Sequence, residues 1–323
     1  MTVVHSPLQY NGSNVFVDLR ATLGIPLLLK CEGFNFARSI KLKAATAMVD
    51  DAEASGMLRE NATLVESSSG NLGVALSMIA ANRGYRFICV TDIRCTRSSI
   101  RMMEALGAEV RVISEPAVDG GLLGARIAHV RELCSAGPHV VWLNQYANPN
   151  NWRAHYRTTG PEILAAVPEV EVVFVGAGTT GTLMGCARYL RDAGGGAKIV
   201  AVDAEGSVTF GFPSRSRMIP GLGTGVRPAQ LDESFVDDVV IVDERETVTA
   251  CRDLAARGFL FGGSTGTVVS GARRWLAENR PGADVEAVAI APDLGESYLD
   301  SVYDDDWVGD LLASQAKPAG VQY

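Results

Sequence analysis

Short apolar runs rich in valine and isoleucine alternate along the chain with longer segments in which apolar residues recur every three or four positions. Runs of the first kind are typical of buried strands, and segments of the second kind are typical of helices that pack on one face. In the first half of the chain, the pattern predicts strands at residues 62–68, 85–92, 108–114 and 139–144. Helices are predicted between these strands, at residues 71–84, 97–107 and 122–137. The glycines that end two of these helices, Gly84 and Gly107, are expected to adopt a left-handed conformation.

The second half of the chain repeats this rhythm. Strands are predicted at residues 171–178, 197–205, 239–244 and 285–293. Helices are predicted near residues 180–193, 245–257 and 265–279. Apolar strands that alternate with helices form parallel sheets covered by helices on both faces. We therefore expect an α/β protein with two three-layer αβα domains, mostly parallel sheets, and chemistry at the carboxyl ends of the strands.

Composition and charge narrow the class of partner. Hydrophobic residues make up 47% of the 323 residues, and the formal net charge is −8 without any basic cluster. This balance argues against nucleic acid and against an anionic membrane surface as partners. The N-terminal segment lacks the basic and apolar pattern of a signal peptide, and no apolar run approaches the roughly 20 residues of a membrane helix. We expect a soluble, cytoplasmic protein.

The cysteines and histidines do not form a metal-binding pattern. The six cysteines are scattered without a C-x-x-C pair, and the four histidines include no pair at ligand spacing. We therefore expect buried, reduced thiols and no metal site.

The stretch VFVGAGTTGTLMG, residues 173–185, places a glycine turn between a predicted strand and a predicted helix. It carries G-x-G-x-x-G at Gly176, Gly178 and Gly181, where backbone N–H groups at the start of a helix favour a bound phosphate. Asp203 ends the following strand, at the place where a ribose-binding acid would lie. A dinucleotide site, and with it an NAD-dependent oxidoreductase, is one alternative.

Three further stretches carry small polar residues or lysines at a predicted helix start: ESSSGNLG at 66–73, FGGSTGTVVSGA at 261–272 and NFARSIKLKAA at 35–45. Taken singly, they are compatible with ordinary helix caps and with solvated lysines. Together they offer several anion-binding turns and a nearby lysine, with no histidine in any turn. This combination favours a small phosphorylated aldehyde cofactor, held covalently by a lysine, over a nicotinamide.

From about residue 6 to residue 300, the chain resembles the cysteine synthase family, the fold-type II (tryptophan synthase β-like) enzymes that depend on pyridoxal 5'-phosphate. NFARSIK matches the N-x-x-x-S-x-K motif that carries the Schiff-base lysine. SSGNLG matches the S-G-N-T-G loop, GTTGT matches the G-T-G-G-T phosphate cup, and GGSTG matches the motif of the serine beside the pyridine nitrogen. Supporting matches are NQYANPNNWRAHYRTTGPEI, IPGLGTG and PDLGESYL.

The resemblance implies a role for each matched residue. Lys41 would carry the cofactor and act as the catalytic base, Asn71 would contact the ring oxygen, and Ser264 would contact the ring nitrogen. The cofactor phosphate would be bound by Gly178, Thr179, Thr180, Gly181 and Thr182. An activated serine would contact Ser67, Ser68, Ser69, Gly70, Leu72, Gln145, Tyr146 and Gly221. Arg215 and Arg217 would stabilise its departing group, although both are also compatible with solvated positions in a loop.

The resemblance also implies a domain organisation and an assembly. Residues 1–36 and 142–323 would form a large domain that binds the cofactor phosphate. Residues 37–141 would form a small, mobile domain that binds the substrate carboxylate. The protein would be a homodimer that acts on small amino acids.

Departures from the family pattern bear on substrate choice. A common aspartate, threonine, proline and phenylalanine are replaced by Leu42, Leu72, Phe36 and Tyr146. SSGNLG resembles the branch that makes precursors of 2,3-diaminopropionate for siderophores and peptide antibiotics, a part of secondary metabolism. We therefore expect a PLP-dependent β-replacement on an activated L-serine, with O-phospho-L-serine and L-glutamate favoured, that gives N-(2-amino-2-carboxyethyl)-L-glutamate. A cysteine synthase that uses O-acetylserine or O-phosphoserine is the nearer alternative.

Overall fold

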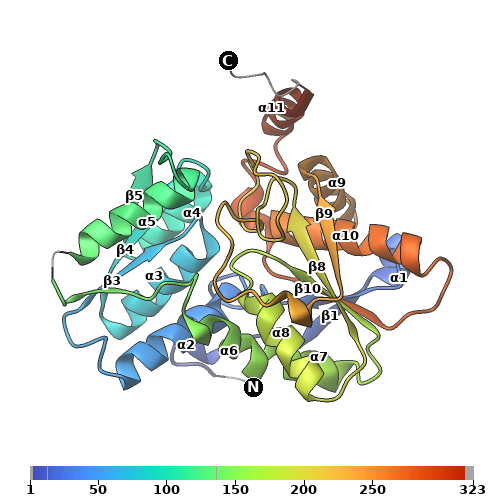
Figure 1. Ribbon diagram of the computed structural model, residues 1–323, viewed down its shortest axis with the longest axis horizontal. Coiled ribbons are helices and arrows are strands. Elements are labelled where there is room, and N and C mark those ends of the chain that lie inside the picture. Colours follow the sequence, from blue (N-terminus) through green and yellow to red (C-terminus); the bar gives the residue numbers. More distant parts are fainter. Residues whose placement is uncertain (1–2, 13, 136, 317–323) are drawn as a thin grey trace.

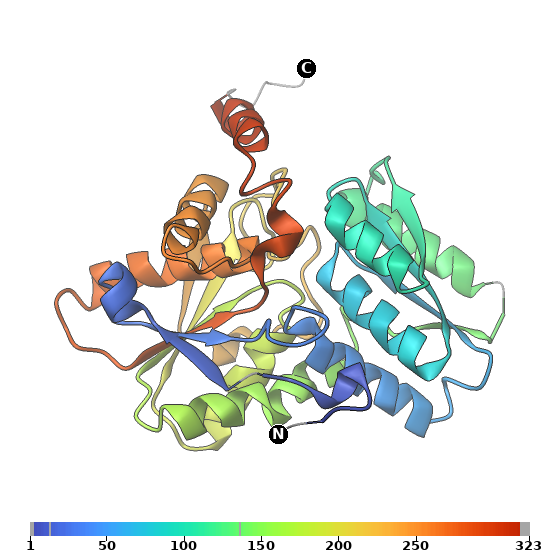
Figure 2. The same cartoon turned by 180° about the vertical axis from the view of Figure 1, so that it is seen from behind.

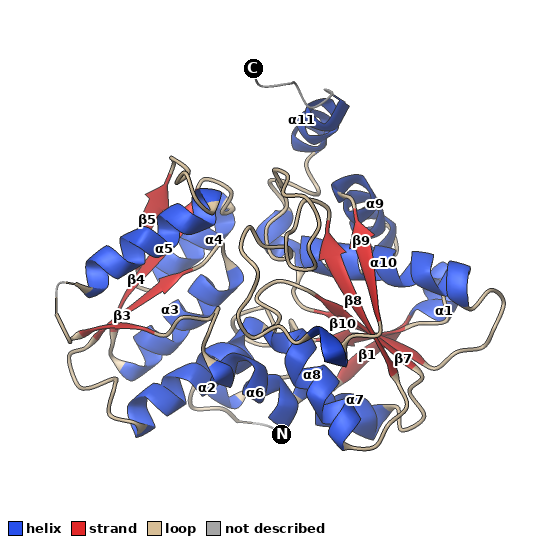
Figure 3. Cartoon of the chain, viewed as in Figure 1, coloured by secondary structure: helices blue, strands red, loops and turns tan. Residues whose placement is uncertain are grey.

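Two mostly parallel sheets lie side by side in the computed structural model, each between layers of helices (Figures 1 and 3). The structure describes residues 3–12, 14–135 and 137–316, so the chain ends at 1–2 and 317–323 lie outside the described residues. The larger sheet has six strands and the smaller sheet has four. The fold class expected from the sequence is confirmed.

The larger sheet has the strand order β1-β2-β10-β7-β8-β9. Its strands are β1 (Val15–Asp18), β2 (Leu28–Cys31), β7 (Val172–Gly176), β8 (Lys198–Ala204), β9 (Asp238–Val242) and β10 (Ala287–Ala291). All neighbours are parallel except β1 and β2, which are antiparallel. The central strands are apolar and β-branched, as in VVFV of β7, because both faces of the sheet are covered. Since β2 pairs with β10, segments from near both ends of the chain lie side by side.

Helices cover both faces of the larger sheet. Those on one face are α1 (Leu19–Leu23), α9 (Glu244–Ala255) and α10 (Gly263–Asn279). Those on the other face are α7 (Thr159–Ala166) and α8 (Gly181–Asp192). α6 (Pro149–Arg157) packs against α8, and α11 (Asp305–Ala316) projects from the body of the molecule (Figure 1).

The smaller sheet has the order β5-β4-β3-β6, with every pair parallel. Its strands are β3 (Thr63–Ser67), β4 (Arg86–Asp92), β5 (Glu109–Ile113) and β6 (Val140–Trp142). Its helices are α2 (Lys41–Ala54), α3 (Asn71–Arg83) and α4 (Arg97–Ala105) on one face and α5 (Gly121–Cys134) on the other. α2 packs against both α3 and α6, so this helix connects the two layered units, as the view from behind in Figure 2 also shows.

The strands and helices predicted from the apolar pattern are confirmed, with ends that agree to within three residues. Gly84 and Gly107 are left-handed, with φ of 79° and 85°, as expected after a helix. Among the elements of the described residues, the pattern missed two strands, β1 and β2, and five helices, α1, α2, α6, α7 and α11. β1 is short and its side chains are half-buried or exposed, so no apolar run marks it.

The strands of the smaller sheet all fall between residues 63 and 142, inside a chain whose earlier and later parts build the larger sheet. The chain therefore leaves the larger sheet after β2 and returns to it after β6. The residue limits expected for the two domains stay a prediction. Within the described residues, no helix is long and apolar enough to cross a membrane.

Candidate active site

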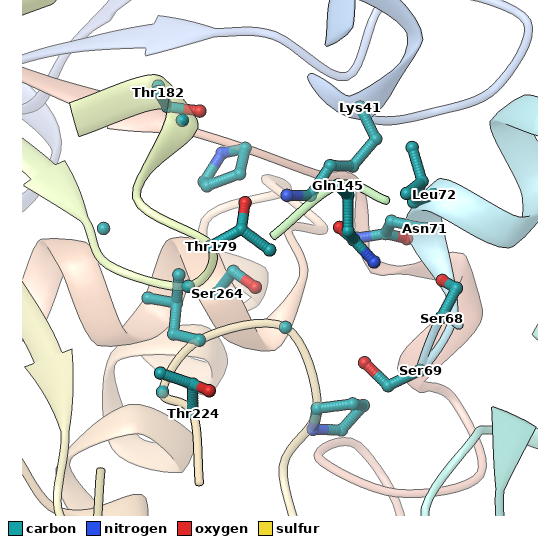
Figure 4. Close-up of a pocket in the computed structure, with 18 of the residues that line it drawn as sticks. Lys41, Ser68, Ser69, Asn71, Leu72, Gln145, Thr179, Thr182, Thr224 and Ser264 are labelled. Carbon is teal, nitrogen blue, oxygen red and sulfur yellow. The ribbon is translucent and has the colours of Figure 1, made fainter. Parts of the chain in front are cut away.

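A cavity lies between the two sheets, at the carboxyl ends of β3, β7 and β10 (Figure 4). Ligands of parallel sheets generally bind at this edge. The cavity brings together these residues from the expected site: Lys41, Ser68, Ser69, Asn71, Leu72, Gln145, Tyr146, Gly178, Thr179, Thr180, Gly181, Thr182, Arg217, Gly221 and Ser264. The contact of each with a cofactor or a substrate stays a prediction.

Lys41 is the first residue of α2, and its side chain points into this cavity (Figure 4). The chain before it is fixed, because the N–H of Ile40 donates to the carbonyl oxygen of Pro292 at 2.7 Å. Desolvation lowers the pKa of Lys41 to about 8, an effect that the carboxylate of Asp293 partly offsets. A lysine with this pKa is partly a free amine near neutral pH, as attack on an aldehyde or removal of a proton requires.

The lowered pKa of Lys41 makes a prediction about stability. In protein freed of any aldehyde cofactor, Lys41→Met should raise the free energy of unfolding by about 3 kcal/mol at pH 7, since the pKa falls from 10.5 to about 8 on folding. Below pH 8 the folded protein must bury the charged ammonium group. As the pH rises from 8 towards 10.5, the unfolded chain also loses this proton, and the advantage of the variant should fade. Urea unfolding of both proteins across this range measures the difference, and a constant difference would contradict the lowered pKa.

Lys43, two residues further along the chain, pairs with carboxylates and does not face the cavity. Its ammonium group lies 3.0 Å from Glu32 Oε1 and 2.7 Å from Glu162 Oε2. The ammonium group of Lys30 pairs with the same two carboxylates, at 2.6 and 2.8 Å. These four residues form a buried ion cluster. Of the two lysines in SIKLK, Lys41 is therefore the one that faces the cavity.

The turn at residues 178–182 forms a cup at the start of α8. Thr180 occupies the cap position with a left-handed φ of 64° and makes no side-chain cap bond, so the first N–H groups of the helix stay available. The Thr180 hydroxyl oxygen is buried and has no hydrogen-bond partner within the described part of the chain. Free N–H groups and a hydroxyl at a helix N-terminus favour a bound anion.

Glycines keep the walls of the cup close together. A Cβ atom on Gly181 would lie 2.1 Å from Asn151 Oδ1, and one on Gly178 would lie 2.9 Å from the carbonyl oxygen of Gly221. The side-chain amide of Asn151 in turn donates to Thr179 Oγ1 at 3.0 Å. The narrow walls and the unpartnered donors fit the phosphate group of pyridoxal phosphate.

His155 lies behind the cup. Its Nε2 is 3.3 Å from Thr182 Oγ1, and its Nδ1 is 3.0 Å from Thr159 Oγ1. Burial, together with the positive charges of three nearby lysines, lowers the pKa of His155 well below 6.5. The imidazole is therefore neutral at pH 7. Because Thr159 also accepts a bond from Lys43 at 3.3 Å, His155 connects the cup to the buried ion cluster.

The loop that starts α3 is organised by Ser68. Its Oγ accepts the N–H groups of Gly70 and Gly73, at 3.2 and 2.9 Å. The O–H of Ser68 is thus left as a donor on the cavity wall, beside Ser69 (Figure 4). Leu72 lines the same wall and presents methyl groups where a threonine would present a hydroxyl. The serine hydroxyls and the N-terminus of α3 form a second anion-binding wall.

Asn71 is oriented by a buried carboxylate. Its Nδ2 donates to Asp293 Oδ2 at 2.8 Å, and the hydroxyl of Tyr298 donates to the same oxygen at 2.6 Å. Ser264 lies in the first turn of α10, where a Cβ atom on Gly221 would lie only 2.2 Å from its Oγ. Gly221, with φ of 111°, therefore lets its loop approach the Ser264 hydroxyl.

The structure does not bring Ser67, Gly70 or Arg215 onto the wall of this cavity. Ser67 is completely buried, and Gly70 lines a neighbouring hollow. Arg215 lies outside the cavity, with 67% of its side chain exposed, and pairs with Glu205. The contact of Arg215 with a departing group therefore stays a prediction that this position does not support.

Asp203 is 0% exposed and lies outside the cavity. Its Oδ1 accepts the N–H of Ala204 at 2.8 Å. Asp203 is therefore not placed to bind the ribose of a dinucleotide.

Sequence reasoning missed Arg94 and Arg126, which both line the cavity. Each forms an ion pair with the buried carboxylate of Asp92, at 3.1 Å. Arg126 is 4% exposed, and its Nη1 has no hydrogen-bond partner among the residues that the structure describes. One signal could have found it: Arg126 shares the helical spacing of the buried Leu123 and Val130, where a charged residue is unusual.

Comparison with known proteins gives consistent matches over most of the chain. A family profile described as "Pyridoxal-phosphate dependent enzyme" matches residues 15–293. A Cupriavidus metallidurans protein called N-(2-amino-2-carboxyethyl)-L-glutamate synthase is 37% identical over 98% of this chain and 94% of that protein. A Ralstonia nicotianae protein with the same name is 39% identical over 89% of this chain and 85% of that protein. The crystal structure of O-ureido-L-serine synthase is similar with a TM-score of 0.84 at 33% identity, over 95% of this chain and 100% of that one.

Proposed function

Because this chain belongs to the family of pyridoxal-phosphate dependent enzymes, we propose that it replaces the β-substituent of O-phospho-L-serine with the amine nitrogen of L-glutamate. The product is N-(2-amino-2-carboxyethyl)-L-glutamate. The observation that carries this proposal is the shared name of two relatives at 37–39% identity. The family and the cofactor expected from the sequence are confirmed, and the dinucleotide alternative is wrong.

The proposed reaction replaces the Cβ–O bond of the serine derivative with a Cβ–N bond. The Cβ–O bond breaks, and its electron pair leaves with the phosphate. The Cβ–N bond forms from the lone pair of the neutral amine, which then loses one proton to the departed phosphate. Inorganic phosphate is therefore the second product.

When bound, pyridoxal phosphate supplies an electron-accepting ring that stabilises negative charge at Cα of the attached amino acid. Lys41 Nζ, with a pKa of about 8, takes the proton from Cα and later returns it. Ser264, which lines the cavity, would offer the ring nitrogen a neutral hydroxyl; such a partner would limit the spread of charge into the ring and favour loss of a β-substituent over transamination. The cup at residues 178–182 would hold the cofactor phosphate, and Asn71 would hold the ring oxygen.

The carboxylate of the serine derivative binds the wall at the start of α3. Ser68 and Ser69 provide hydroxyl donors there. Gln145 completes this wall, and its Nε2 is fixed by donating to the carbonyl oxygen of Ser67 at 2.7 Å. Leu72 removes one donor from the wall and adds apolar surface that keeps water away from the reacting carbon.

Arg126 supplies positive charge for the departing phosphate. Such charge is needed because the negative charge on the leaving oxygen grows as the Cβ–O bond breaks. The guanidinium group is held 3.1 Å from Asp92 and keeps its Nη1 without a partner in the described part of the chain. A dianionic phosphate gains more from this group than an acetate does, which favours O-phospho-L-serine over O-acetyl-L-serine.

The proposal also includes the cellular location, the oligomeric state and the metabolic role of the enzyme. It is a cytoplasmic homodimer that serves secondary metabolism by supplying nitrogen for 2,3-diaminopropionate. The names of the two relatives support a role in the supply of 2,3-diaminopropionate. The homodimer rests on the resemblance to the cysteine synthase family.

The test is turnover by the purified holoenzyme. We expect one inorganic phosphate released for each molecule of N-(2-amino-2-carboxyethyl)-L-glutamate formed, as measured by a phosphate assay and mass spectrometry. With O-phospho-L-serine as the first substrate, kcat/KM for L-glutamate should exceed that for sulfide on the order of 100-fold. Turnover with sulfide but not with L-glutamate would identify a cysteine synthase instead. Equal use of O-acetyl-L-serine would remove the role given to Arg126.

A further inference from the structure

Arg94 and Arg217 reach the same cavity from different sheets. Arg94 follows β4 of the smaller sheet, and Arg217 lies in the long loop between β8 and β9 of the larger sheet. Neither belongs to the phosphate cup or to the wall at the start of α3. The proposed β-replacement, as described so far, therefore assigns no role to these two guanidinium groups.

Each of the two arginines is held in place and keeps N–H groups to spare. Arg94 donates from Nε and Nη2 to the two oxygens of Asp92, both at 3.1 Å, and its side chain is 30% exposed. Arg217 is 8% exposed, and its Nη1 donates to the carbonyl oxygen of Gly206. A Cβ atom on Gly223 would lie 2.9 Å from Arg217 Nε, so the glycine makes room for the guanidinium group.

The charges around this pair are not balanced by the protein at contact distance. Within the described residues, Asp92 is the carboxylate that pairs with Arg94, and no ion pair is made by Arg217. Asp203 and Glu244 act on Arg217 from beyond ion-pair distance. Burial and, after it, the positive charge of Arg94 lower the pKa of the Arg217 guanidinium group, as expected for two like charges that line one cavity. An anion between them would relieve this repulsion.

We propose that Arg94 and Arg217 form one anion subsite next to Arg126, with which Arg94 shares Asp92; this subsite holds the phosphate after it has left Cβ and then a carboxylate of the incoming amine. This inference rests on the proposed function. Phosphate and amine are bonded in succession to the same carbon, so the phosphate must leave the space that the amine enters. The cup at residues 178–182 is filled by the cofactor phosphate at that stage, and a dicarboxylic amine brings the next anion. The product phosphate therefore competes with the amine for the two arginines.

The first test measures binding of inorganic phosphate to the holoenzyme by calorimetry, at constant ionic strength. The bound cofactor fills the cup, so the added phosphate reports on the other anion-binding groups of the cavity, and the variants decide whether Arg94 and Arg217 are among them. Arg94→Gln and Arg217→Gln should each weaken phosphate binding by about 10- to 100-fold, because each removes a charge-assisted donor. The matched control is Arg215→Gln, whose exposed side chain pairs with Glu205 outside the cavity, and it should bind phosphate as the unchanged protein does.

The second test is competition in steady-state kinetics. Inorganic phosphate should raise KM for L-glutamate without lowering kcat, and Arg217→Gln should raise KM for L-glutamate and abolish this competition. Arg217→Lys keeps the charge with fewer donors, and it replaces the glutamine variant if the latter does not fold.

The outcomes separate the subsite from the proposed function. Unchanged phosphate affinity in both glutamine variants would overturn the subsite. Weakened phosphate binding without competition against L-glutamate would overturn its shared use. If phosphate binds as expected but no amine is converted, the subsite stands and the proposed function fails.

Discussion

Lys41→Ala should lower the rate of β-replacement by about 10³- to 10⁴-fold and leave the protein folded. The reason is that this ammonium group faces the cavity with a pKa lowered to about 8, so we expect it to provide the amine for the cofactor and the base for Cα. Phosphate release measures the loss of rate. Treatment with borohydride followed by mass spectrometry should find the cofactor attached to the unchanged protein and not to the variant.

Lys43 provides the matched control for this experiment. Lys43→Met disrupts a cluster in which the ammonium group pairs with Glu32 and Glu162, so it should lower stability. Borohydride should still fix the cofactor to Lys41 in this variant. Attachment that survives in Lys41→Ala and disappears in Lys43→Met would reverse the assignment of the two lysines.

Glu32→Gln should lower the free energy of unfolding by about 3–5 kcal/mol, the range for removing one partner of a buried ion pair. Glu32 is completely buried, and its carboxylate lies 2.6 Å from the ammonium nitrogen of Lys30 and 3.0 Å from that of Lys43. The substitution would leave the two lysines of the cluster to share Glu162. The midpoint of urea unfolding, followed by circular dichroism, measures the change.

Glu205→Gln is the control, because it removes a carboxylate from an exposed pair. Glu205 pairs with Arg215, and the two side chains are 45% and 67% exposed. Exposed pairs contribute less than about 1 kcal/mol, so the urea midpoint should hardly move. Equal shifts in the two variants would show that burial of the cluster does not set its contribution to stability.

The sequence was sufficient to predict those parts of the site whose chemistry lies within a few consecutive residues. The turn at 178–182 and the loop around Asn71 each combine a strand end, small polar residues and a helix start. Local backbone geometry places these N–H groups and hydroxyls together, whatever the rest of the fold does. The alternation of strands and helices likewise fixed the fold class, because apolar strands separated by helices can be covered only in layers.

The parts that could not be predicted depend on partners far apart along the chain. Asn71 and Asp293, which share a hydrogen bond, are separated by 222 positions, and Lys43 and Glu162 by 119. No local pattern announces such a pair, because each partner alone is compatible with a solvated position. For Arg126, the helical spacing indicates burial but not the partner, because its carboxylate, Asp92, lies at the end of a strand and not on its own helix.

Arg215 and Arg217 illustrate a different limit. The sequence gives them the same residue type two positions apart, and both were expected to contact the departing group. The loop that carries them has no regular secondary structure, so their spacing does not determine the direction of either side chain. Arg217 faces the cavity, whereas Arg215 pairs with Glu205 outside it.

The pairing of β2 with β10 also bears on synthesis of the chain by the ribosome. The strands of the smaller sheet emerge consecutively and are able to pair early, but the larger sheet must wait for residues 287–291. Pro292 and Asp293 emerge immediately afterwards. The carbonyl oxygen of Pro292 accepts the N–H of Ile40, next to Lys41, and the carboxylate of Asp293 acts on the charge of Lys41. A nascent chain that ends before them lacks the hydrogen bond from Ile40 to Pro292, so the backbone before Lys41 reaches its final position only when translation is nearly finished.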